Sequence, residues 1–364
     1  MIDNSDQTSQ LSEVIYLTNL LQSAEIPPAL KDKIEVKLKR LRRMARQGQS
    51  AGEYESVAKY IDTCLKIPWN KVHQDNLDLV SVKKKMDELH YGSENVKEVV
   101  MEYLAVMKRK TESGNADYTS PVLAFVGVQG GGKTSLAKAI ASALGRPFYR
   151  ISLGAVGKPS ELRGTPSSSI DSQPGQIVRA LANAECMNPV VLLDEFDKVS
   201  GDDGLRTDLM AILLEIMDPE QNKNFRDWYL DYPVDLSKIL FIATANRFTT
   251  ITRELLDRLE IIEFPDYTID EKVQIAKKYL FKKSLRYAGL SENELVIEDD
   301  AWPILTKSYG KDYGVRRLEQ NLQKLCRKVT KAIVLGRAQR VEINSSNATQ
   351  FVDYIVSDLE SLRG

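Results

Sequence analysis

The sequence predicts an α/β protein in which a doubly wound parallel sheet follows a helical arm and precedes a small helical domain. Three observations support this prediction. From Pro121 onward, short apolar runs alternate with helical stretches, which is typical of a parallel sheet. Before Pro121, and again after Pro265, apolar residues recur instead at the spacing of amphipathic helices. A glycine-rich turn, Gly127 to Gly132, lies between the first apolar run and the helix that follows it.

The helical arm is best marked by Leu30, Ile34, Leu38 and Leu41, which fall on one helical face. Basic residues fill most positions between them: Lys31, Lys33, Lys37, Lys39, Arg40, Arg42 and Arg43. A basic helix can bind nucleic acid, but a solvated face beside an apolar stripe is the interpretation that we favour. A further amphipathic helix is predicted from Ser93 to about Lys110.

The strands of the sheet are predicted from short apolar runs bounded by turns or helices. These runs are Val122–Val126, Phe148–Leu153, Val190–Leu193, Ile239–Ala243 and Ile261–Phe264.

After Pro265 the chain becomes helical again. Asp270 to Arg286 is amphipathic, a longer helix is predicted from Gly314 to about Leu335, and a short strand is predicted at Val341–Ile343. The tail is expected to be helical at Phe351–Leu362. We therefore predict four parts, a helical arm (1–70), an α/β domain (71–265), a small helical domain (266–343) and a tail (344–364).

Charge and composition limit the classes of partner. The 364 residues carry 50 Lys and Arg against 51 Asp and Glu, and this balance gives no electrostatic case for nucleic acid or an anionic membrane as main partner. The 3 cysteines are widely spaced, which suits a reducing compartment, and with only 2 histidines a His-based triad or zinc site is disfavoured. An acidic amino terminus and the lack of a long apolar span predict a cytoplasmic protein without signal peptide or membrane segment.

Residues 127–134 have the spacing of a phosphate-binding loop. The segment Gly-Val-Gln-Gly-Gly-Gly-Lys-Thr follows a strand and opens a helix, the context in which G-x-x-x-x-G-K-[ST] binds phosphate. Glycines let backbone N–H groups turn inward around a polyphosphate, and the helix points its positive end at the same anion. The lysine reaches the β- and γ-phosphates, and the threonine hydroxyl ligates Mg²⁺. The sequence therefore predicts a nucleoside triphosphate site formed by Gly127, Gly130, Gly131, Gly132, Lys133, Thr134 and Ser135.

Two acids end the predicted strand that begins at Val190. Parallel-sheet enzymes place ligand groups at the carboxyl ends of strands, so Asp194 and Glu195 are expected to face the phosphate loop. Asp194 would hold Mg²⁺ through water, and Glu195 would orient and activate the attacking water. The alternative is an acidic helix cap, since Asp197 also lies in this segment.

Further positions carry weaker signals. Asn246 ends a buried strand and can hydrogen-bond the γ-phosphate, although such an Asn more often marks an ordinary turn. Arg258, in Leu-Leu-Asp-Arg, is either a surface charge or, in a ring, an arginine finger worth about 10³–10⁵ in rate. Arg316 opens a helix, where it either senses phosphate or decorates the helix surface.

In this order, the phosphate loop, the Asp-Glu strand, the Asn-tipped strand, Leu-Leu-Asp-Arg and Gly-Val-Arg resemble an AAA+ ATPase with its P-loop core. The sequence between them narrows the resemblance to the ATPase module of Lon-type proteases, from about residue 28 to about residue 343. The segments that carry it are His90–Gly92, Glu102–Val106, Arg150–Gly154, Asn188–Lys198, Leu214–Asn222 and Phe241–Asn246.

The resemblance implies a ring, usually of six subunits, that hydrolyses ATP to unfold and thread protein substrates. It implies that Lys133 and Thr134 bind phosphate and Mg²⁺, and that Asp194 and Glu195 are the metal-binding and catalytic acids. The α/β domain would bind nucleotide, and the domain at 266–343 would be its helical lid.

The resemblance also gives roles to residues outside the phosphate loop. It implies that Asn246 is the first sensor, Arg258 the finger that acts on the neighbouring subunit, and Arg316 the second sensor on the lid. It places His90 and Tyr91 in the adenine pocket, although the sequence alone also allows plain packing at a helix entry.

The chain departs from the family pattern in three ways. The protease domain with its Ser–Lys dyad and the large amino-terminal substrate domain are expected to lie outside this sequence. In the substrate-gripping loop, Ser169 followed by Ile170 stands where the family has an aromatic residue, whose contact area serine cannot supply. The phosphate loop has an extra glycine, which raises the ordering entropy of the empty loop but removes no phosphate donor. These changes predict retained nucleotide binding and weaker gripping.

Three hypotheses follow for what ATP hydrolysis drives. The first is an unfolding motor related to Lon, acting as a homo-hexamer on unfolded protein, with a peptidase supplied by a full-length protease or a separate chain. The second is a nucleotide-switched ring that binds a protein or, with weaker support, DNA without threading it, as Ser169 suggests. The third is a fragment without independent biology. We favour the first, with no peptidase site in this chain.

Overall fold

The computed structural model describes residues 4–47, 51–114, 122–169, 171–199, 203–247, 251–307 and 314–351. By its internal contacts the chain divides into two compact units, each assembled from three segments. The first unit comprises Met1–Met86, Val99–Val126 and Ala137–Ile262, and the second comprises Asp87–Glu98, Gly127–Leu136 and Glu263–Gly364. The division at residues 70, 265 and 343 follows sequence pattern rather than contacts, and it stays a prediction.

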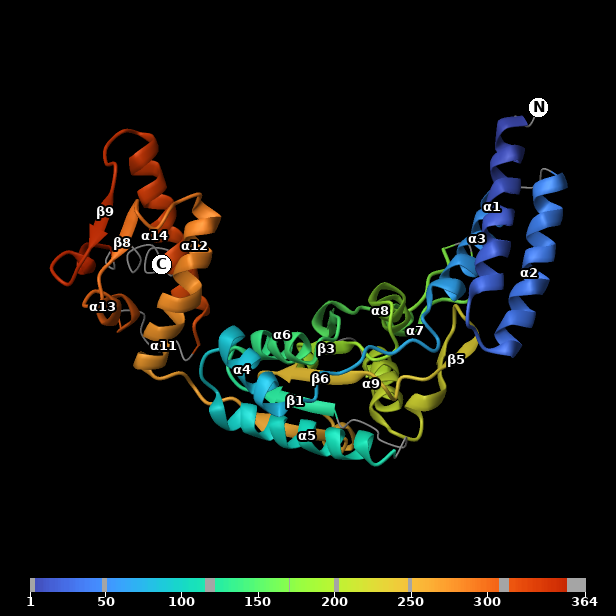
Figure 1. Cartoon of the computed structure of the whole chain (residues 1–364), viewed down its shortest axis with the longest axis horizontal. Coiled ribbons are helices and arrows are strands. Elements are labelled where there is room, and N and C mark those ends of the chain that lie inside the picture. The colour runs from blue at the N-terminus through green and yellow to red at the C-terminus, as the bar shows by residue number, and fades with distance from the viewer. Residues whose placement is uncertain are drawn as a thin grey trace. The chain divides into compact units, whose positions relative to one another are not determined.

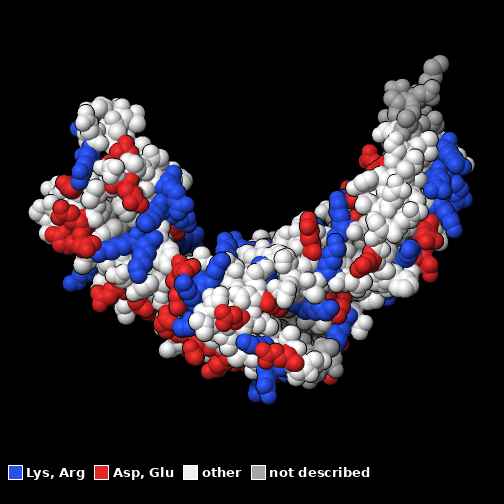
Figure 2. All heavy atoms as spheres, in the orientation of Figure 1, with Lys and Arg blue, Asp and Glu red and all other residues white. Residues whose placement is uncertain are grey.

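The helical arm belongs to the first unit and consists of α1 (Asn4–Ser23), α2 (Pro28–Gln47) and α3 (Ala51–Lys66), which pack on one another (Figure 1). The predicted apolar stripe of α2 is confirmed, because Leu30, Ile34, Leu38 and Leu41 are all buried. The basic residues of α2 lie mostly outside this stripe, and Figure 2 shows Lys and Arg gathered over the helix. The arm is therefore a small bundle with one basic outer face.

A sheet of five strands forms the centre of the first unit, in the order β2-β3-β6-β1-β7. The strands are β1 (Val122–Val126), β2 (Phe148–Ser152), β3 (Val190–Asp194), β6 (Leu240–Ala245) and β7 (Leu259–Glu263). The pairs β2–β3, β3–β6 and β6–β1 are parallel, and helices lie on both sides of the sheet (Figure 1). Because both faces are covered, β1, β3 and β6 are buried along their whole length. The predicted doubly wound α/β fold is confirmed.

Seven helices between the arm and β7 precede or connect the strands of the sheet in the described residues. They are α4 (Leu79–Leu89), α5 (Glu94–Glu112), α6 (Lys133–Leu144), α7 (Pro159–Arg163), α8 (Gln176–Ala184), α9 (Asp203–Met217) and α10 (Arg253–Leu256). The predicted helix from Ser93 to Lys110 corresponds to α5.

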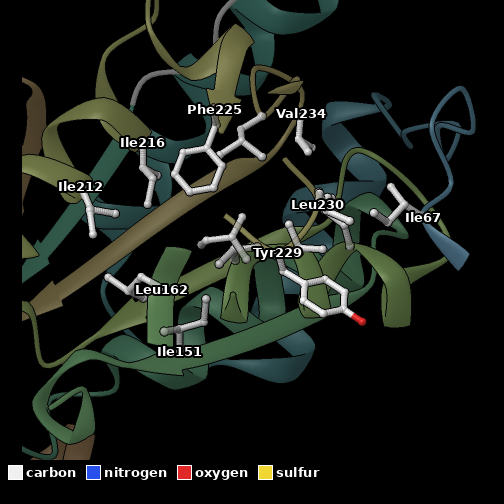
Figure 3. Close-up of a cluster of buried hydrophobic side chains, with 14 of the residues drawn as sticks. Ile67, Ile151, Leu162, Ile212, Ile216, Phe225, Tyr229, Leu230 and Val234 are labelled. Carbon is white, nitrogen blue, oxygen red and sulfur yellow. The ribbon is translucent and has the colours of Figure 1, made fainter. Parts of the chain in front are cut away.

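A small antiparallel hairpin, β4 (Phe225–Asp227) and β5 (Tyr232–Val234), was not predicted. Strands of three residues are too short to show a period, and β5 contains a proline. Its apolar side chains are buried against the arm, β2, α7 and α9 (Figure 3). The residues labelled there are Ile67, Ile151, Leu162, Ile212, Ile216, Phe225, Tyr229, Leu230 and Val234.

The second unit has its own core around α14. Its elements are α11 (Ile269–Ile275), a π-helical turn (Ala276–Leu280), α12 (Phe281–Ala288), β8 (Leu295–Ile297), α13 (Trp302–Lys307), α14 (Arg316–Val334) and β9 (Val341–Ile343). Buried residues of α14 pack with Trp302 of α13 and Leu285 of α12. The predicted strand β9 is confirmed and runs parallel to the unpredicted β8. The predicted helix of 270–286 is interrupted by the π-helical turn, and the predicted tail helix lies, after Phe351, outside the described residues.

The three cysteines, Cys64, Cys186 and Cys326, are buried free thiols. In the part of the chain that the structure describes, every helix is too short or too polar to cross a bilayer.

Candidate functional site

The glycine-rich turn lies between β1, which ends at Val126, and α6, which begins at Lys133. Gly130 and Gly132 have φ angles of +83° and +87°, in the region that favours glycine. A Cβ atom on Gly132 would also overlap the hydroxyl of Tyr267 and would lie 2.6 Å from Cε1 of His90. Glycine is thus required at this position by the backbone angle and by close packing.

Lys133 is the buried cation of this turn. Its Nζ donates to the carbonyl oxygens of Gly127 and Val128 at 2.6 and 2.9 Å, which holds the ammonium against the loop. Half-buried Thr134 and exposed Ser135 follow in the first turn of α6, whose N-terminus carries partial positive charge. An ammonium, a hydroxyl and a helix N-terminus are the groups that bind a magnesium-bound triphosphate, so the residues present fit that ligand.

The start of α14 lies directly against the same loop within the second unit. The Val315 N–H donates to the Gly130 carbonyl oxygen at 3.1 Å, and a Cβ on Gly314 would overlap the Gln129 carbonyl oxygen. Arg316 is the first residue of α14, and its backbone nitrogen would lie 3.0 Å from a Cβ on Gly130. The structure therefore brings Arg316 to the phosphate loop.

His90 and Tyr91 differ in their contacts. His90 packs on Gly132 and is 4% exposed, and burial, together with the nearby charge of Lys97, lowers its pKa to about 4. The imidazole is therefore neutral at pH 7 and can make uncharged hydrogen bonds. Tyr91 packs on the core of the second unit, where its ring centroid lies 4.8 Å from Nζ of Lys278. Of this pair, His90 is the residue that borders the loop.

The two acids lie at the carboxyl end of β3 in the first unit. Asp194 is the last residue of the strand, is 7% exposed, and accepts a 2.6 Å hydrogen bond from Nε of Arg150. The Thr244 hydroxyl of the adjacent strand β6 donates to the other oxygen of Asp194 and accepts from the Glu195 N–H at 3.1 Å. Thr244 thus bridges the two acids.

Glu195 has the left-handed backbone angles φ +59° and ψ +45°, which are unusual for a residue with a side chain. Its Oε1 accepts from Nζ of Lys198 at 2.9 Å, and a Cβ on Gly154 would lie 2.8 Å from its Oε2. Such strained backbone recurs at active sites, where surrounding contacts hold it. The partly exposed carboxylate is suited to contact water, whereas the buried Asp194 is suited to a metal.

Comparison with known proteins identifies the families that share these features. Residues 123–267 match the ATPase family associated with various cellular activities (AAA), and residues 286–341 match the Lon protease AAA+ ATPase lid domain. The chain is 41% identical over 334 residues to a Lon protease of Halothermothrix orenii, covering 92% of this chain and 41% of that protein. It is also 41% identical over 348 residues to Lon protease 1 of Bacillus subtilis, covering 95% of this chain and 44% of that protein.

The chain is a Lon-type AAA+ ATPase module. It binds nucleotide, as the AAA family match and the phosphate loop together indicate. The module spans about two-fifths of the length of the curated relatives it matches, including a Lon protease of Dictyoglomus thermophilum that is 43% identical over 324 residues. That match covers 89% of this chain and 40% of the relative.

The two remaining polar positions lie in the first unit of the Lon-type module. Asn246 directly follows β6, and β6 pairs in parallel with β3, so Asn246 and the acids lie at the same end of the sheet. Arg258 follows α10, and its side chain is 47% exposed and forms a 3.0 Å ion pair with Asp218. The exposed side chain of Arg258 can contact another molecule, but only if its ion pair with Asp218 first breaks.

The loop that contains Ser169 lies between α7 and α8. Ser169 is exposed, and its N–H donates to the Pro166 carbonyl oxygen at 2.9 Å within a tight turn. Ile170, the second residue at the predicted gripping position, lies outside the described residues.

Sequence reasoning missed several residues that border these positions in the Lon-type module. Tyr267 packs on Gly132, Thr244 bridges the acids, and Arg150 pairs with Asp194. A hydroxyl residue inside the apolar strand 240–245 was a usable signal for Thr244. Tyr267 and Arg150 gave no such signal, because their contacts depend on segments that are distant in sequence.

Proposed function

We propose that this module hydrolyses Mg²⁺-ATP in a homo-hexameric ring and couples the reaction to unfolding and translocation of protein substrates for proteolysis. The observation that carries the proposal is the composition of the second unit, in which His90, Tyr267 and Val315 all border the phosphate loop. Nucleotide in that loop would therefore act directly on the first turn of α14. The AAA match and the Lon relatives support the ATPase and its coupling to protein substrates.

Each catalytic position has a role in the proposed reaction. Lys133 would neutralise phosphate charge, and Glu195 would take the proton of the water that attacks the γ-phosphate. Thr134 and Asp194 would hold Mg²⁺, which supplies charge neutralisation at the phosphate oxygens. Two positions support these assignments: Thr134 lies in the first turn of α6, and Asp194 is the last residue of β3.

The test of the ATPase assignment is Glu195→Gln, which removes the base and keeps the shape of the side chain. We expect the variant to bind ATP with unchanged affinity and to lose at least about 100-fold in turnover. Lys198→Gln is the control, because it removes the partner of Glu195 but leaves the carboxylate. Turnover by Glu195→Gln at the wild-type rate would refute the assignment.

A second candidate function is favoured by Ser169, whose side chain offers little area to grip a polypeptide. In that case the ring opens and closes on a folded protein or on DNA without threading. ATPase rates measured with an unfolded protein, a folded protein or DNA separate the two candidates, since threading predicts stimulation by the unfolded protein. Ser169→Tyr should then raise that stimulation. The separate peptidase and the cytoplasmic location stay predictions, and we expect degradation only when a peptidase is added.

A further inference from the structure

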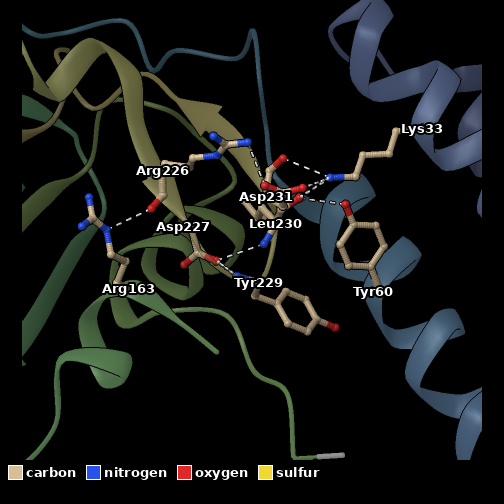
Figure 4. A network of polar contacts seen from close by, with 8 residues as sticks. All are labelled: Lys33, Tyr60, Arg163, Arg226, Asp227, Tyr229, Leu230 and Asp231. Carbon is tan, nitrogen blue, oxygen red and sulfur yellow. Dashed lines mark hydrogen bonds and ion pairs between the residues drawn. The ribbon is translucent and has the colours of Figure 1, made fainter. Parts of the chain in front are cut away.

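The β4–β5 hairpin is fastened on one side to the helical arm (Figure 4). Lys33 of α2 donates from Nζ to the carbonyl oxygens of Leu230 and Asp231 at 3.3 and 3.0 Å, and to the Asp231 carboxylate at 3.0 Å. The Tyr60 hydroxyl of α3 donates to the same Leu230 oxygen at 2.8 Å. Together with the buried apolar side chains of Figure 3, these bonds fix the hairpin against the arm.

On its other side the hairpin reaches the Ser169 loop through one carboxylate. Asp227 is 0% exposed, and its Oδ1 accepts from the N–H groups of Tyr229 and Leu230 at 2.8 and 3.1 Å (Figure 4). Its Oδ2 accepts from the Gly175 N–H at 2.8 Å. The first two bonds shape the turn of the hairpin, whereas the third holds the point at which the loop enters α8.

The base of this loop, Gly164–Gly175, is closed tightly around the same carboxylate. A Cβ on Gly164 would lie 2.9 Å from Oδ1 of Asp227, and a Cβ on Gly175 would lie 2.8 Å from Oδ2. Thr165 and Gln173 exchange two hydrogen bonds across the base, at 2.9 and 2.8 Å. The tip beyond them is at the surface, since Ser168 and Ser169 are exposed. The loop therefore has a fixed base and an exposed tip.

Arg163 adds a second link between the loop and the hairpin. Its Nε donates to the Arg226 carbonyl oxygen at 3.1 Å, and its own carbonyl oxygen accepts from the Trp228 N–H at 2.7 Å. Both bonds join the residue before Gly164 to the hairpin backbone. The loop base and the hairpin thus form one hydrogen-bonded body.

We propose that Asp227 positions the Gly164–Gly175 loop for contact with a polypeptide, by tying the base of the loop to a hairpin that the helical arm holds in place. The inference rests on the proposed function, because the loop carries Ser169. A tip of serines makes small contacts, so little binding energy is available to order the loop. A base that is ordered in advance removes that cost.

The sharpest test is Asp227→Asn in the full chain. The amide has one oxygen and one NH₂ group in place of two acceptors. If the oxygen keeps the N–H groups of Tyr229 and Leu230, the NH₂ group faces the Gly175 N–H, and two donors meet. The substitution therefore breaks the bond to the loop and spares the turn of the hairpin. Asp235→Asn is the matched control. In this exposed residue one carboxylate oxygen accepts a hydrogen bond from the Ser237 N–H at 2.9 Å, and the asparagine oxygen can accept the same bond.

Two measurements read the result. Hydrogen exchange of the Gly175 amide is expected to be roughly tenfold or more faster in Asp227→Asn and unchanged in Asp235→Asn, because a bond to a charged acceptor is lost. The basal ATPase rate is expected to stay unchanged, whereas the stimulation of that rate by an unfolded protein is expected to fall severalfold. A merely structural defect would lower both rates together.

The outcomes separate this inference from the proposed function. A wild-type chain that unfolded protein does not stimulate refutes the proposed function without any variant. If unfolded protein stimulates the wild type, the role of Asp227 is overturned by either of two results in Asp227→Asn. One is wild-type protection of the Gly175 amide, and the other is wild-type stimulation of the ATPase rate. If circular dichroism shows that Asp227→Asn is unfolded, Lys33→Met at the other anchor of the hairpin takes its place. Lys33→Met is then expected to speed hydrogen exchange of the Gly175 amide by a smaller factor, and unchanged protection of this amide overturns the proposal.

Discussion

At the scale of single residues, two requirements for glycine at position 132 of the phosphate loop can be distinguished: the positive φ angle and the close packing of neighbouring side chains. Gly132 and Gly145 have similar φ angles, +87° and +78°, so alanine at either position carries a similar backbone penalty of about 1 kcal/mol. Only at Gly132 would the new Cβ meet other atoms, those of His90 and Tyr267, whereas nothing lies within 4 Å of a Cβ on Gly145. The pair therefore separates strain from crowding.

We expect Gly145→Ala to lower the free energy of unfolding by about 1 kcal/mol and to leave ATP affinity unchanged. Gly132→Ala is expected to reduce ATP affinity at least about tenfold in addition, because His90, Tyr267 or the loop must move. Urea unfolding and equilibrium binding of a fluorescent ATP analogue measure the two quantities. Equal ATP affinity in both variants would contradict the assigned packing.

The pH dependence of stability is a second prediction at this scale, and it concerns Asp227. Burial raises the pKa of its carboxyl group from 3.8 to about 6, although three N–H groups and the charge of Arg163 act in the opposite direction. Because the folded pKa exceeds the unfolded one, the native state binds the proton more tightly between these two values. The stability from Asp227 is thus complete below pH 3.8 and is lost as pH rises through about 6, by about 3 kcal/mol in total.

Urea unfolding of the wild type and of Asp227→Asn at about pH 4 and about pH 7 isolates this group, since other carboxyl groups are common to both proteins. We expect the stability advantage of the wild type over the variant to be larger at the lower pH. Asp235→Asn serves as the control, for which the difference should stay constant. An advantage that grows toward neutral pH would show that Asp227 is stabilised in its charged form.

At the scale of elements, the sequence predicted best those segments whose pattern is long or fully apolar. The core strands β1, β3 and β6 and the helix α14 were located to within a few residues, and the buried face of α2 was identified, because burial along a whole strand or one helical face is visible in the residue types. The β4–β5 hairpin and β8 were missed, since three residues give only a weak periodic signal, whereas β9, which is equally short, was predicted. Their stability comes from packing against distant segments, which local pattern does not encode.

The same distinction applies to the candidate site. The phosphate loop was predicted from fixed spacing along the chain, and the acids at 194 and 195 were predicted from their place at the end of an apolar run. Thr244, Tyr267 and Asp227 act through hydrogen bonds or packing contacts whose partners include residues far away in sequence. No spacing rule describes such contacts, so they become visible only once the sheet order and the hairpin are known.

At the scale of the whole molecule, the proposed ring makes a prediction that a single chain cannot fulfil. Arg258 is paired with Asp218 of its own chain, so its proposed action on a neighbouring γ-phosphate requires that this ion pair exchange. Arg258→Ala and Glu195→Gln should each abolish hydrolysis, but for different reasons. An Arg258→Ala subunit keeps Glu195 and lacks the arginine for its neighbour, whereas a Glu195→Gln subunit keeps Arg258 and lacks the base.

Mixing the two variants therefore tests whether the site is shared between subunits. In a randomly mixed ring, an active site forms wherever an Arg258→Ala subunit is followed by a Glu195→Gln subunit, which applies to about one interface in four. We expect the mixture to recover about a quarter of the wild-type ATPase rate although each variant alone is inactive. Sedimentation with ATP checks that both variants assemble, and Asp218→Asn, which removes the charge that pairs with Arg258, should retain activity. Assembled mixtures as inactive as their parents would show that Arg258 does not act across subunits.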